Sequence, residues 1–281
     1  MGNIKFICTS SLALLVCFSL VQNLIADPQE DIKTYQDYFI KRFPKVEFQE
    51  FSNGIYAIND AMRENWEAME EFPPYEPFID DGKVMWDTAF SNGKSYAQCF
   101  PDGPGSKHLY PRWDKQQGQV VTLALAINQC RESNGEQLLK YNEGPIAQIL
   151  SYMAWESRGK KTNVVVPSDD PRAMQAYEKG KEYYFTRRGQ LNFACYHCHF
   201  SSSGLNLRAD VLSTAVGQTT GWPVYRSKWG TVGTLHRRYI GCNKQVRAKP
   251  FKAQSEEYRN LEYFHSAMSN GIELNGPSSR K

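Results

Sequence analysis

The sequence predicts a mainly α-helical fold that is built from two tandem copies of one small unit. Three observations support this prediction: apolar residues recur at helical spacing in several segments, long alternating strand patterns do not occur, and the two halves of the chain share short matching segments. Hydrophobic residues make up 41% and charged residues 22% of the 281 residues. This composition is that of a globular protein and excludes a disordered chain.

Helices are predicted where apolar side chains fall on one face of a 3.6-residue repeat. Two such stripes are Ile58, Met62, Trp66 and Met69, and Ile146, Ile149, Leu150 and Met153. Pro145 opens the second helix, because proline is favoured in the first turn. A third helix is predicted to begin at Asp170-Pro171 and to run towards Gly189. Segments rich in Gly, Pro and Ser, such as 101–111 and 201–204, are predicted to be loops.

The first 26 residues have the pattern of a secretory signal peptide. Lys5 is their only charged residue, an apolar run covers residues 12–21, and Ala26 ends the segment. The alternative is an uncleaved membrane anchor, but Gln22 breaks the apolar run short of the roughly 20 residues that a membrane span needs. We therefore expect residues 1–26 to be removed when the chain is exported.

Positive charge is concentrated in one segment of the chain. The net charge is +3, and it falls to about +2 without the leader, so the overall charge says little about function. Between Asp210 and Glu256, however, no acidic residue occurs. The basic residues in this acid-free segment are Arg226, Lys228, Arg237, Arg238, Lys244, Arg247, Lys249 and Lys252. A small anion or an acidic partner surface is the expected ligand of such a segment.

The cysteines indicate a covalently bound haem. Five remain after export, namely Cys99, Cys130, Cys195, Cys198 and Cys242. The segment from Cys195 to His199 is a C-x-x-C-H motif, in which the two thiols add to the haem vinyl groups and the histidine binds the iron. A zinc knuckle would need a second ligand pair, and a redox dithiol would not need the histidine. We therefore expect one haem c, attached through Cys195 and Cys198, with His199 as an axial ligand.

The second axial ligand stays open at this point, and four downstream side chains are candidates: His236, Cys242, His265 and Met268. Methionine is a common second ligand in cytochromes c. Met268 and His265 lie on one helical stripe, however, which favours a packing role for both. Cys242 lies in the acid-free segment, where Arg238 and Lys244 favour the thiolate form. Its alternatives are a buried inert thiol and an intermolecular disulfide.

The internal similarity predicts where the two units lie. Gly93-Lys94-Ser95-Tyr96 precedes Cys99, much as Gly180-Lys181-Glu182-Tyr183 precedes Cys195, and the interval from Cys130 to Gly159 equals that from Cys242 to Gly271. We therefore predict a first unit over residues 27–165 and a second, haem-binding unit over residues 166–281. They are expected to be tandem cytochrome-c-like domains.

The first unit has no C-x-x-C-H motif, so it cannot hold a c-type haem. In place of a haem we expect a disulfide bond between Cys99 and Cys130. This bond would close a loop of about 30 residues and would stabilise a domain that lacks its cofactor by about 3 kcal/mol. The alternative, two reduced and buried thiols, is disfavoured outside the cytoplasm. The first domain is therefore predicted to be haem-free.

The residues collected so far resemble the SoxA family, the cytochrome subunit of the L-cysteine S-thiosulfotransferase in the bacterial thiosulfate-oxidising Sox system. The segments that carry the resemblance are Arg237-Arg238-Tyr239-Ile240-Gly241-Cys242-Asn243 and the C-x-x-C-H motif. The resemblance implies that His199 and Cys242 are the axial ligands of the iron. It also implies that Arg238 binds substrate and that Cys242 is the catalytic cysteine, found as a persulfide. The chain resembles the single-haem branch of the family.

The resemblance also implies a function, a location and partners. Thiosulfate is expected to be joined oxidatively to a cysteine of a SoxYZ-type carrier protein in the periplasm, with electrons leaving through haem to a SoxX-type small cytochrome subunit. No nucleic acid is expected as a partner. One alternative is a plain monohaem electron carrier with Met268 as the sixth ligand. Another is a haem-bearing sensor or scaffold that docks a partner through the basic segment.

Overall fold

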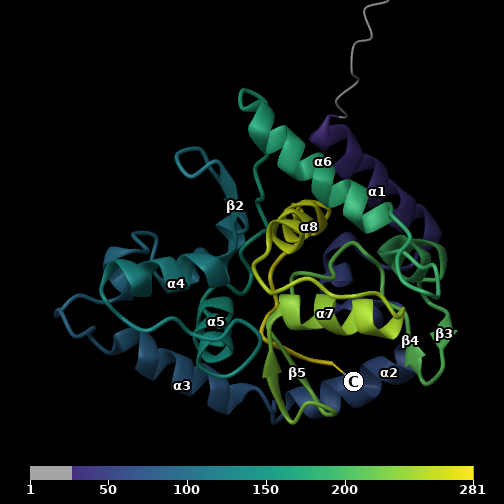
Figure 1. The fold of residues 1–281 in the computed structure, drawn as a ribbon. Coiled ribbons are helices and arrows are strands. Elements are labelled where there is room, and N and C mark those ends of the chain that lie inside the picture. Colours follow the sequence, from purple (N-terminus) through teal and green to yellow (C-terminus); the bar gives the residue numbers. More distant parts are fainter. Residues whose placement is uncertain (1–26, 281) are drawn as a thin grey trace, which may run out of the picture.

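The computed structural model describes residues 27–280 and is mainly α-helical, as predicted (Figure 1). The long helices are α1 (Pro28–Arg42), α2 (Asp60–Glu70), α3 (Glu76–Asp87), α4 (Leu123–Ser133), α5 (Pro145–Trp155), α6 (Pro171–Phe185), α7 (Leu235–Gln245) and α8 (Glu256–Ala267). The short helical turns are η1 (Phe48–Ala57), η2 (Tyr96–Gln98), η3 (Pro104–Leu109) and η4 (His197–Ser201). Within residues 27–280 no helix is long and apolar enough to cross a membrane. The predicted signal peptide lies outside the described residues.

The strands are short and form three small sheets. They are β1 (Arg112–Asp114), β2 (Gln119–Val121), β3 (Asn206–Leu207), β4 (Asp210–Val211), β5 (Val224–Arg226), β6 (Thr231–Gly233) and β7 (Ser278–Arg280). β1 with β2 and β3 with β4 make antiparallel hairpins. In the third sheet β5 is central, antiparallel to β6 and parallel to β7. This sheet returns the end of the chain to the side of α7 (Figure 1).

Two pairs of helices, α3 with α5 and α6 with α8, pack closely because each pair has a glycine at the point of contact. A Cβ atom added at Gly82 in α3 would lie 2.0 Å from the carbonyl oxygen of Gln148 in α5. A Cβ atom added at Gly180 in α6 would lie 2.0 Å from the carbonyl oxygen of Asn260 in α8. Both helix crossings therefore require glycine. Gly82, and not Gly93 as the sequence comparison proposed, is the counterpart of Gly180.

A hairpin followed by a helix also occurs twice. The β1–β2 hairpin leads into α4 and the β5–β6 hairpin leads into α7, and one constant offset in residue number relates both strand registers. Each helix is capped by a threonine hydroxyl, Thr122 for α4 and Thr234 for α7, which accepts a hydrogen bond from a backbone amide in the first turn. The same offset brings Cys130 in α4 into correspondence with Cys242 in α7. The local structure around the two cysteines is therefore the same.

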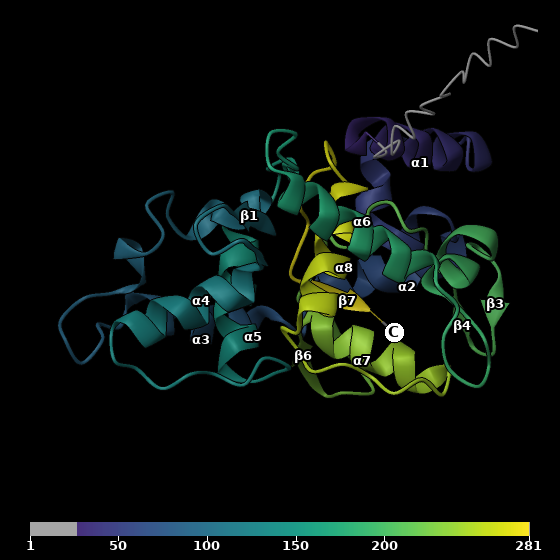
Figure 2. The same ribbon diagram turned by 45° about the horizontal axis from the view of Figure 1, so that its top comes forward.

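Buried side chains form two hydrophobic cores. One core, which we call the N-terminal core, is built by residues from α3, α4 and α5. The other, the C-terminal core, is built by residues from α6 and α8 together with Ile32, Phe39 and Phe51 from the start of the chain. Figure 2 shows α3, α4 and α5 on one side and α1, α6, α7 and α8 on the other. Residues before α2 thus pack with the second half of the chain, and a division into two domains at residue 165 stays a prediction.

The disulfide bond between Cys99 and Cys130 is present and lies in the N-terminal half. It joins the turn after η2 to α4, with the two Cα atoms 5.8 Å apart. Cys130 is buried, and the side-chain amide of Asn134 donates a hydrogen bond to its carbonyl oxygen at 2.8 Å. The bond therefore ties α4 to the preceding loop at the position where the second half has the thiol of Cys242.

Candidate functional site

The C-x-x-C-H motif lies on one helical turn after α6. Its second part is π-helical, from His197 to Ser201. Cys195 and Cys198 are three residues apart, which places both sulfur atoms on the same side of the turn. Neither thiol is in a disulfide bond, and both are partly buried. The local structure thus presents two free thiols and the following histidine together.

Two neighbouring residues contact the ring of His199. The carbonyl oxygen of Ser213, which only accepts, lies 3.0 Å from Nδ1 and favours the tautomer with the proton on Nδ1. The amide nitrogen of Gln218 lies 3.0 Å from Nδ1 and 3.3 Å from Nε2. Burial lowers the pKa of His199 to about 4, although the bond to Ser213 opposes the shift, and Arg238 lowers it further. The ring is therefore neutral, and the tautomer that Ser213 favours has the lone pair on Nε2, as a metal-binding histidine requires.

Helix α7 supplies the residues that face this motif. Arg238 and Cys242 are four residues apart on α7 and therefore share one face of the helix. The pKa of the Cys195 thiol is raised to about 12, first by burial and then by the charges of Cys242 and Cys198. Burial and Cys242 also raise the pKa of Cys198, whereas Arg238 lowers it. These mutual effects show that the thiol of Cys242 and the guanidinium of Arg238 lie next to the C-x-x-C-H motif.

Side chains around the motif fit a covalent haem. Two thiols on one turn and the histidine that follows them are the groups that attach and bind a c-type haem, and Cys242 offers a third thiol on the facing helix. Within residues 27–280 no cluster of three or more His, Cys, Asp or Glu side chains is suited to a bare metal ion. Nearby, the Nε2 atom of His265 is buried and has no hydrogen-bond partner among these residues. A haem therefore fits this site better than an isolated ion.

Two of the four candidates for the second axial ligand have other roles in the structure. His236 accepts a hydrogen bond from the backbone amide of Gln254 at Nδ1, and its Nε2 lies 2.9 Å from the Glu262 carboxylate without the alignment of a hydrogen bond. Met268 is fully buried in the C-terminal core at the end of α8. The position of Cys242 next to the C-x-x-C-H motif favours Cys242 over His236 and Met268 as the second axial ligand.

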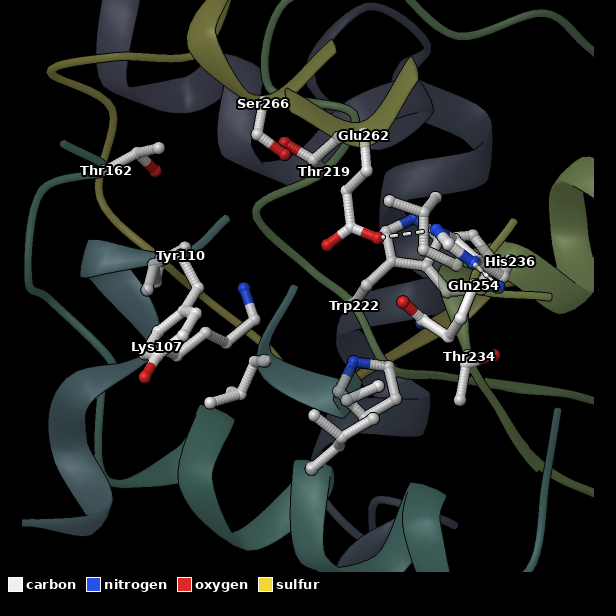
Figure 3. A pocket seen from close by; sticks show the side chains of 16 residues that line it. Lys107, Tyr110, Thr162, Thr219, Trp222, Thr234, His236, Gln254, Glu262 and Ser266 are labelled. Atoms are coloured by element: carbon white, nitrogen blue, oxygen red, sulfur yellow. Dashed lines mark hydrogen bonds and ion pairs between the residues drawn. The ribbon is translucent and has the colours of Figure 1, made fainter. Parts of the chain in front are cut away.

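His236 faces a separate cavity of about 60 Å³ between the two halves of the chain. Figure 3 shows Lys107 and Glu262 pointing into this cavity, with the Glu262 carboxylate next to His236. Burial lowers the pKa of Lys107 to about 8, against an opposing effect of Glu262. The residues of the C-x-x-C-H motif, Arg238 and Cys242 do not line it. This cavity is therefore distinct from the haem site.

The basic segment divides into residues that lie at the site and residues that do not. Lys244, Arg247, Lys249 and Lys252 are exposed on and after the end of α7. Arg237 contacts Glu143 at 2.6 Å and stacks on Trp229. Arg226 and Lys228, in contrast, both interact electrostatically with Arg238 and Cys242. The sequence placed these two in a basic stretch but gave no sign of this electrostatic interaction.

Comparison with known proteins is consistent with this geometry. A family model described as SoxA/TsdA, cytochrome c domain, matches residues 81–162. The L-cysteine S-thiosulfotransferase subunit SoxA of Allochromatium vinosum is 60% identical over 256 residues, covering 91% of each chain. The protein of the same name from Chlorobaculum tepidum is 49% identical over 251 residues, covering 89% of this chain and 87% of its own. The chain belongs to the SoxA family.

A solved structure supports the same assignment. The crystal structure of SoxXA from P. pantotrophus superposes with a TM-score of 0.70 at 33% identity, and the match covers 80% of this chain and 86% of that one. Membership in the SoxA family confirms the prediction of a covalently bound haem c and of a cytochrome c fold. The family model matches the half of this SoxA chain that has the disulfide bond in place of the C-x-x-C-H motif.

Proposed function

We propose that this SoxA chain acts as a subunit of an L-cysteine S-thiosulfotransferase and couples thiosulfate to a cysteine of a sulfur carrier protein. The observation that carries the proposal is the position of Arg238 and Cys242 on one face of α7, next to the C-x-x-C-H motif. The L-cysteine S-thiosulfotransferase SoxA subunits that are 60% and 49% identical to this chain support the same activity.

The roles of the residues follow from their chemistry. Cys195 and Cys198 would hold the haem covalently, and His199 and Cys242 would bind its iron. When bound, the haem supplies a one-electron acceptor that passes electrons to another cytochrome. Arg238 binds thiosulfate, because a guanidinium group matches a forked oxyanion and is charged at every physiological pH. Cys242 is the catalytic cysteine, which carries sulfur as a persulfide.

The coupling balances as an oxidation. A sulfur–sulfur bond forms between the terminal sulfur of thiosulfate and the carrier thiol, the S–H bond of that thiol breaks, and one proton and two electrons are released. The electrons require an acceptor, for which a SoxX-type small cytochrome subunit is the proposed partner; the similarity to a SoxXA structure supports this choice. A SoxYZ-type protein is the proposed carrier, and the periplasm is the proposed location.

Substitution of Arg238 tests the proposal directly. The holoprotein, combined with a SoxX-type cytochrome and a SoxYZ-type carrier, should reduce the cytochrome in a thiosulfate-dependent reaction. Arg238→Gln should lose at least 90% of this activity while its visible spectrum stays that of the wild type, since roughly 1.5–3 kcal/mol of charge-assisted hydrogen bonding is removed. Arg247→Gln is the matched control, because Arg247 is exposed beyond α7, and it should keep full activity.

The ligand assignment has its own test. Cys242→Ala should change the visible spectrum of the oxidised haem, because the thiolate ligand is lost. A methionine-to-iron charge-transfer band that is present in the wild type and unaffected by Cys242→Ala would identify a plain electron carrier with Met268 on the iron. Full activity of Arg238→Gln would reject the substrate-binding role of that residue.

A further inference from the structure

The first helix of the described chain packs against the residues that follow the C-x-x-C-H motif, although the two are 158 residues apart in sequence. We call residues 28–57 the N-terminal segment; it comprises α1, η1 and the residues between them. α1 lies along α6 (Figure 1), and the ammonium group of Lys181 donates a hydrogen bond to the Asp31 carboxylate at 2.6 Å. The last turn of α1 reaches the end of η4, which carries His199.

The guanidinium group of Arg42 joins α1 to the end of η4. Its Nη1 atom donates a hydrogen bond to the carbonyl oxygen of Phe200 at 3.0 Å. Its Nη2 atom donates to the carbonyl oxygens of Ser201 at 3.2 Å and of Ser203 at 3.0 Å. Carbonyl groups at the end of a helical turn have no donor within the helix, and an arginine side chain can supply one. One side chain of α1 therefore holds three carbonyl groups of the haem-binding turn.

Arg42 is itself fixed by its neighbours on α1. Its Nη1 atom also donates a hydrogen bond to the hydroxyl group of Tyr38 at 2.7 Å. Its guanidinium carbon lies 5.6 Å from the centre of the Phe43 ring and 5.9 Å from the centre of the Tyr38 ring. The side chain is half-buried. Because packing restrains the guanidinium group, the group restrains the backbone that it binds.

The side chain of Phe200 is held by the same helix. Its ring lies against three aromatic rings of α1, with centroid distances of 5.5 Å to Tyr35, 5.6 Å to Tyr38 and 4.9 Å to Phe39. Phe200 directly follows His199 in the sequence. The neighbour of the histidine is thus fixed by α1 through both its backbone and its ring.

The loop on the other side of His199 also rests on the N-terminal segment. The backbone amide of Ala215 in this loop donates a hydrogen bond to the carbonyl oxygen of His199 at 3.0 Å. Gly217 has a φ of 78°, and a Cβ atom added to it would lie 1.9 Å from the carbonyl oxygen of Phe51 in η1. The loop therefore packs directly on the backbone of η1. Both supports of His199 depend on the N-terminal segment.

We propose that Arg42 is a positioning residue of the haem site, which fixes the orientation of the His199 ring towards the haem iron by holding the carbonyl groups at the end of η4. This inference rests on the proposed axial role of His199. Groups that do not touch a metal commonly set the orientation of the histidine that does. Ser213 and Gln218 contact the ring directly, whereas Arg42 acts through the backbone. A purely structural tie would add stability and leave the orientation of the ring unchanged.

The test compares Arg42→Gln with Arg158→Gln in the holoprotein. Arg158 is the matched control, because its guanidinium group also holds backbone carbonyl groups, those of Gly276 at 3.1 Å and Pro277 at 2.7 Å. In Arg42→Gln the backbone amides of residues 202–205 should exchange with solvent roughly 10- to 100-fold faster, because charge-assisted hydrogen bonds to this turn are lost. In Arg158→Gln these amides should exchange as in the wild type.

The orientation of the ligand is measured on the haem itself. The electron paramagnetic resonance g values of a ferric low-spin haem depend on the orientation of the axial imidazole plane. Arg42→Gln should therefore shift the g values, and Arg158→Gln should leave them unchanged. Arg42→Lys keeps the charge and some of the donors, so it should recover part of both effects. Thermal unfolding of all three variants separates these changes from a general loss of stability.

Each other outcome overturns the inference. Faster exchange with wild-type g values in Arg42→Gln would make Arg42 a structural tie only. Equal shifts of the g values in Arg158→Gln would assign the effect to the fold as a whole. If Arg42→Gln does not fold, Arg42→Lys decides, and wild-type g values in that variant would overturn the positioning role.

Failure of this inference can be told apart from failure of the proposed ligand set. Near-infrared magnetic circular dichroism of the wild type identifies the axial ligands of the haem. A haem without a histidine ligand would reject the proposed role of His199 and this inference with it. Histidine ligation in the wild type together with unchanged g values in Arg42→Gln would reject this inference alone.

Discussion

The hydroxyl group of Tyr239 on α7 lies 2.9 Å from the Nδ1 atom of His265 on α8. Both side chains are buried, with His265 only 3% exposed, and they link the helix that carries Cys242 to the helix behind it. The constant offset between the two halves places Met153 in α5 at the position of His265. A polar pair therefore occurs in the haem-binding half where the other half has an apolar side chain.

This pair makes the stability of the protein sensitive to acid. Burial lowers the pKa of His265 to about 3, and the nearby His199 lowers it further. Between pH 6.5 and 3 the unfolded chain therefore binds the proton that the folded chain refuses, so stability falls as the pH falls through this range. For His265 alone the loss from pH 7 to 5 is about 2 kcal/mol. Urea unfolding at both pH values should show a smaller decline in His265→Phe, and an equal decline would contradict this account.

Two glycines in helix interiors should respond to alanine in opposite directions. A Cβ atom at Gly180 would lie 2.0 Å from the carbonyl oxygen of Asn260, so Gly180→Ala must separate α6 from α8 and should cost about 3 kcal/mol. At Gly241 in α7 no atom lies within 4 Å of an added Cβ. Gly241→Ala should stabilise the protein by up to about 1 kcal/mol through helix propensity. Thermal unfolding of both variants measures the difference, and shifts of the same sign would be inconsistent with these packing geometries.

The sequence predicted the helices well where local signals were strong. The stripe from Ile146 to Met153 with its opening proline is α5, and the helix predicted to begin at Asp170-Pro171 is α6. The stripe from Ile58 to Met69 corresponds to α2 except for Ile58, which precedes the helix, but no residue of α2 is buried, and Met69 is 39% exposed. The periodic pattern thus identified a helix. It could not predict how the apolar face of that helix packs, because packing depends on distant parts of the chain.

The prediction of an internal repeat was correct for one of its two matched positions. The match of Cys130 with Cys242 was right, because one constant offset relates the hairpins and helices that surround them. The match of Gly93 with Gly180 was wrong, since the glycine at the equivalent helix crossing is Gly82. Similar spacing before a cysteine is a weak guide when the two halves differ in their loops. Only the packing of the helices reveals which glycine is equivalent.

The candidate site was predictable as far as it is local in sequence. The C-x-x-C-H motif is a contiguous segment whose chemistry is determined by its own residues. The roles of Ser213 and Gln218, which contact the ring of His199, could not be predicted, because those contacts depend on how the following loop folds back.

The disulfide bond should stabilise the half of the protein that has no haem. Cys99→Ala/Cys130→Ala removes the cross-link and should lower the free energy of unfolding by about 3 kcal/mol, the value expected for a closed loop of about 30 residues. The haem spectrum should not change, because both cysteines lie in or against the N-terminal core. Urea unfolding with and without a thiol reductant measures the effect. Free thiols at both positions in the mass spectrum of the unreduced protein would disprove the cross-link.

Lys107, which lines the cavity between the two halves, should make the stability of the protein change in alkali. Burial holds the pKa of Lys107 at about 8, below its usual value of 10.5, against the opposing charge of Glu262. Between pH 8 and 10.5 the unfolded chain binds a proton that the folded chain has released, so the free energy of unfolding rises with the pH in this range. Below pH 8 the cost of holding the charged ammonium group in the folded protein lowers the free energy of unfolding. Lys107→Met should therefore stabilise the protein at pH 7 and flatten the rise above pH 8.

We expect this change in stability because Lys107 lies in the cavity, and not because a lysine is replaced by methionine. Lys252→Met is the matched control, because Lys252 is exposed and the substitution is the same. After Lys107 is replaced, the carboxylate of Glu262 keeps the Nε2 atom of His236 as a neighbour at 2.9 Å. Urea unfolding at pH 7 and pH 9.5 gives the comparison. A destabilised Lys107→Met at pH 7 would show that the ammonium group is held by a favourable interaction with Glu262 that exceeds the cost of its burial.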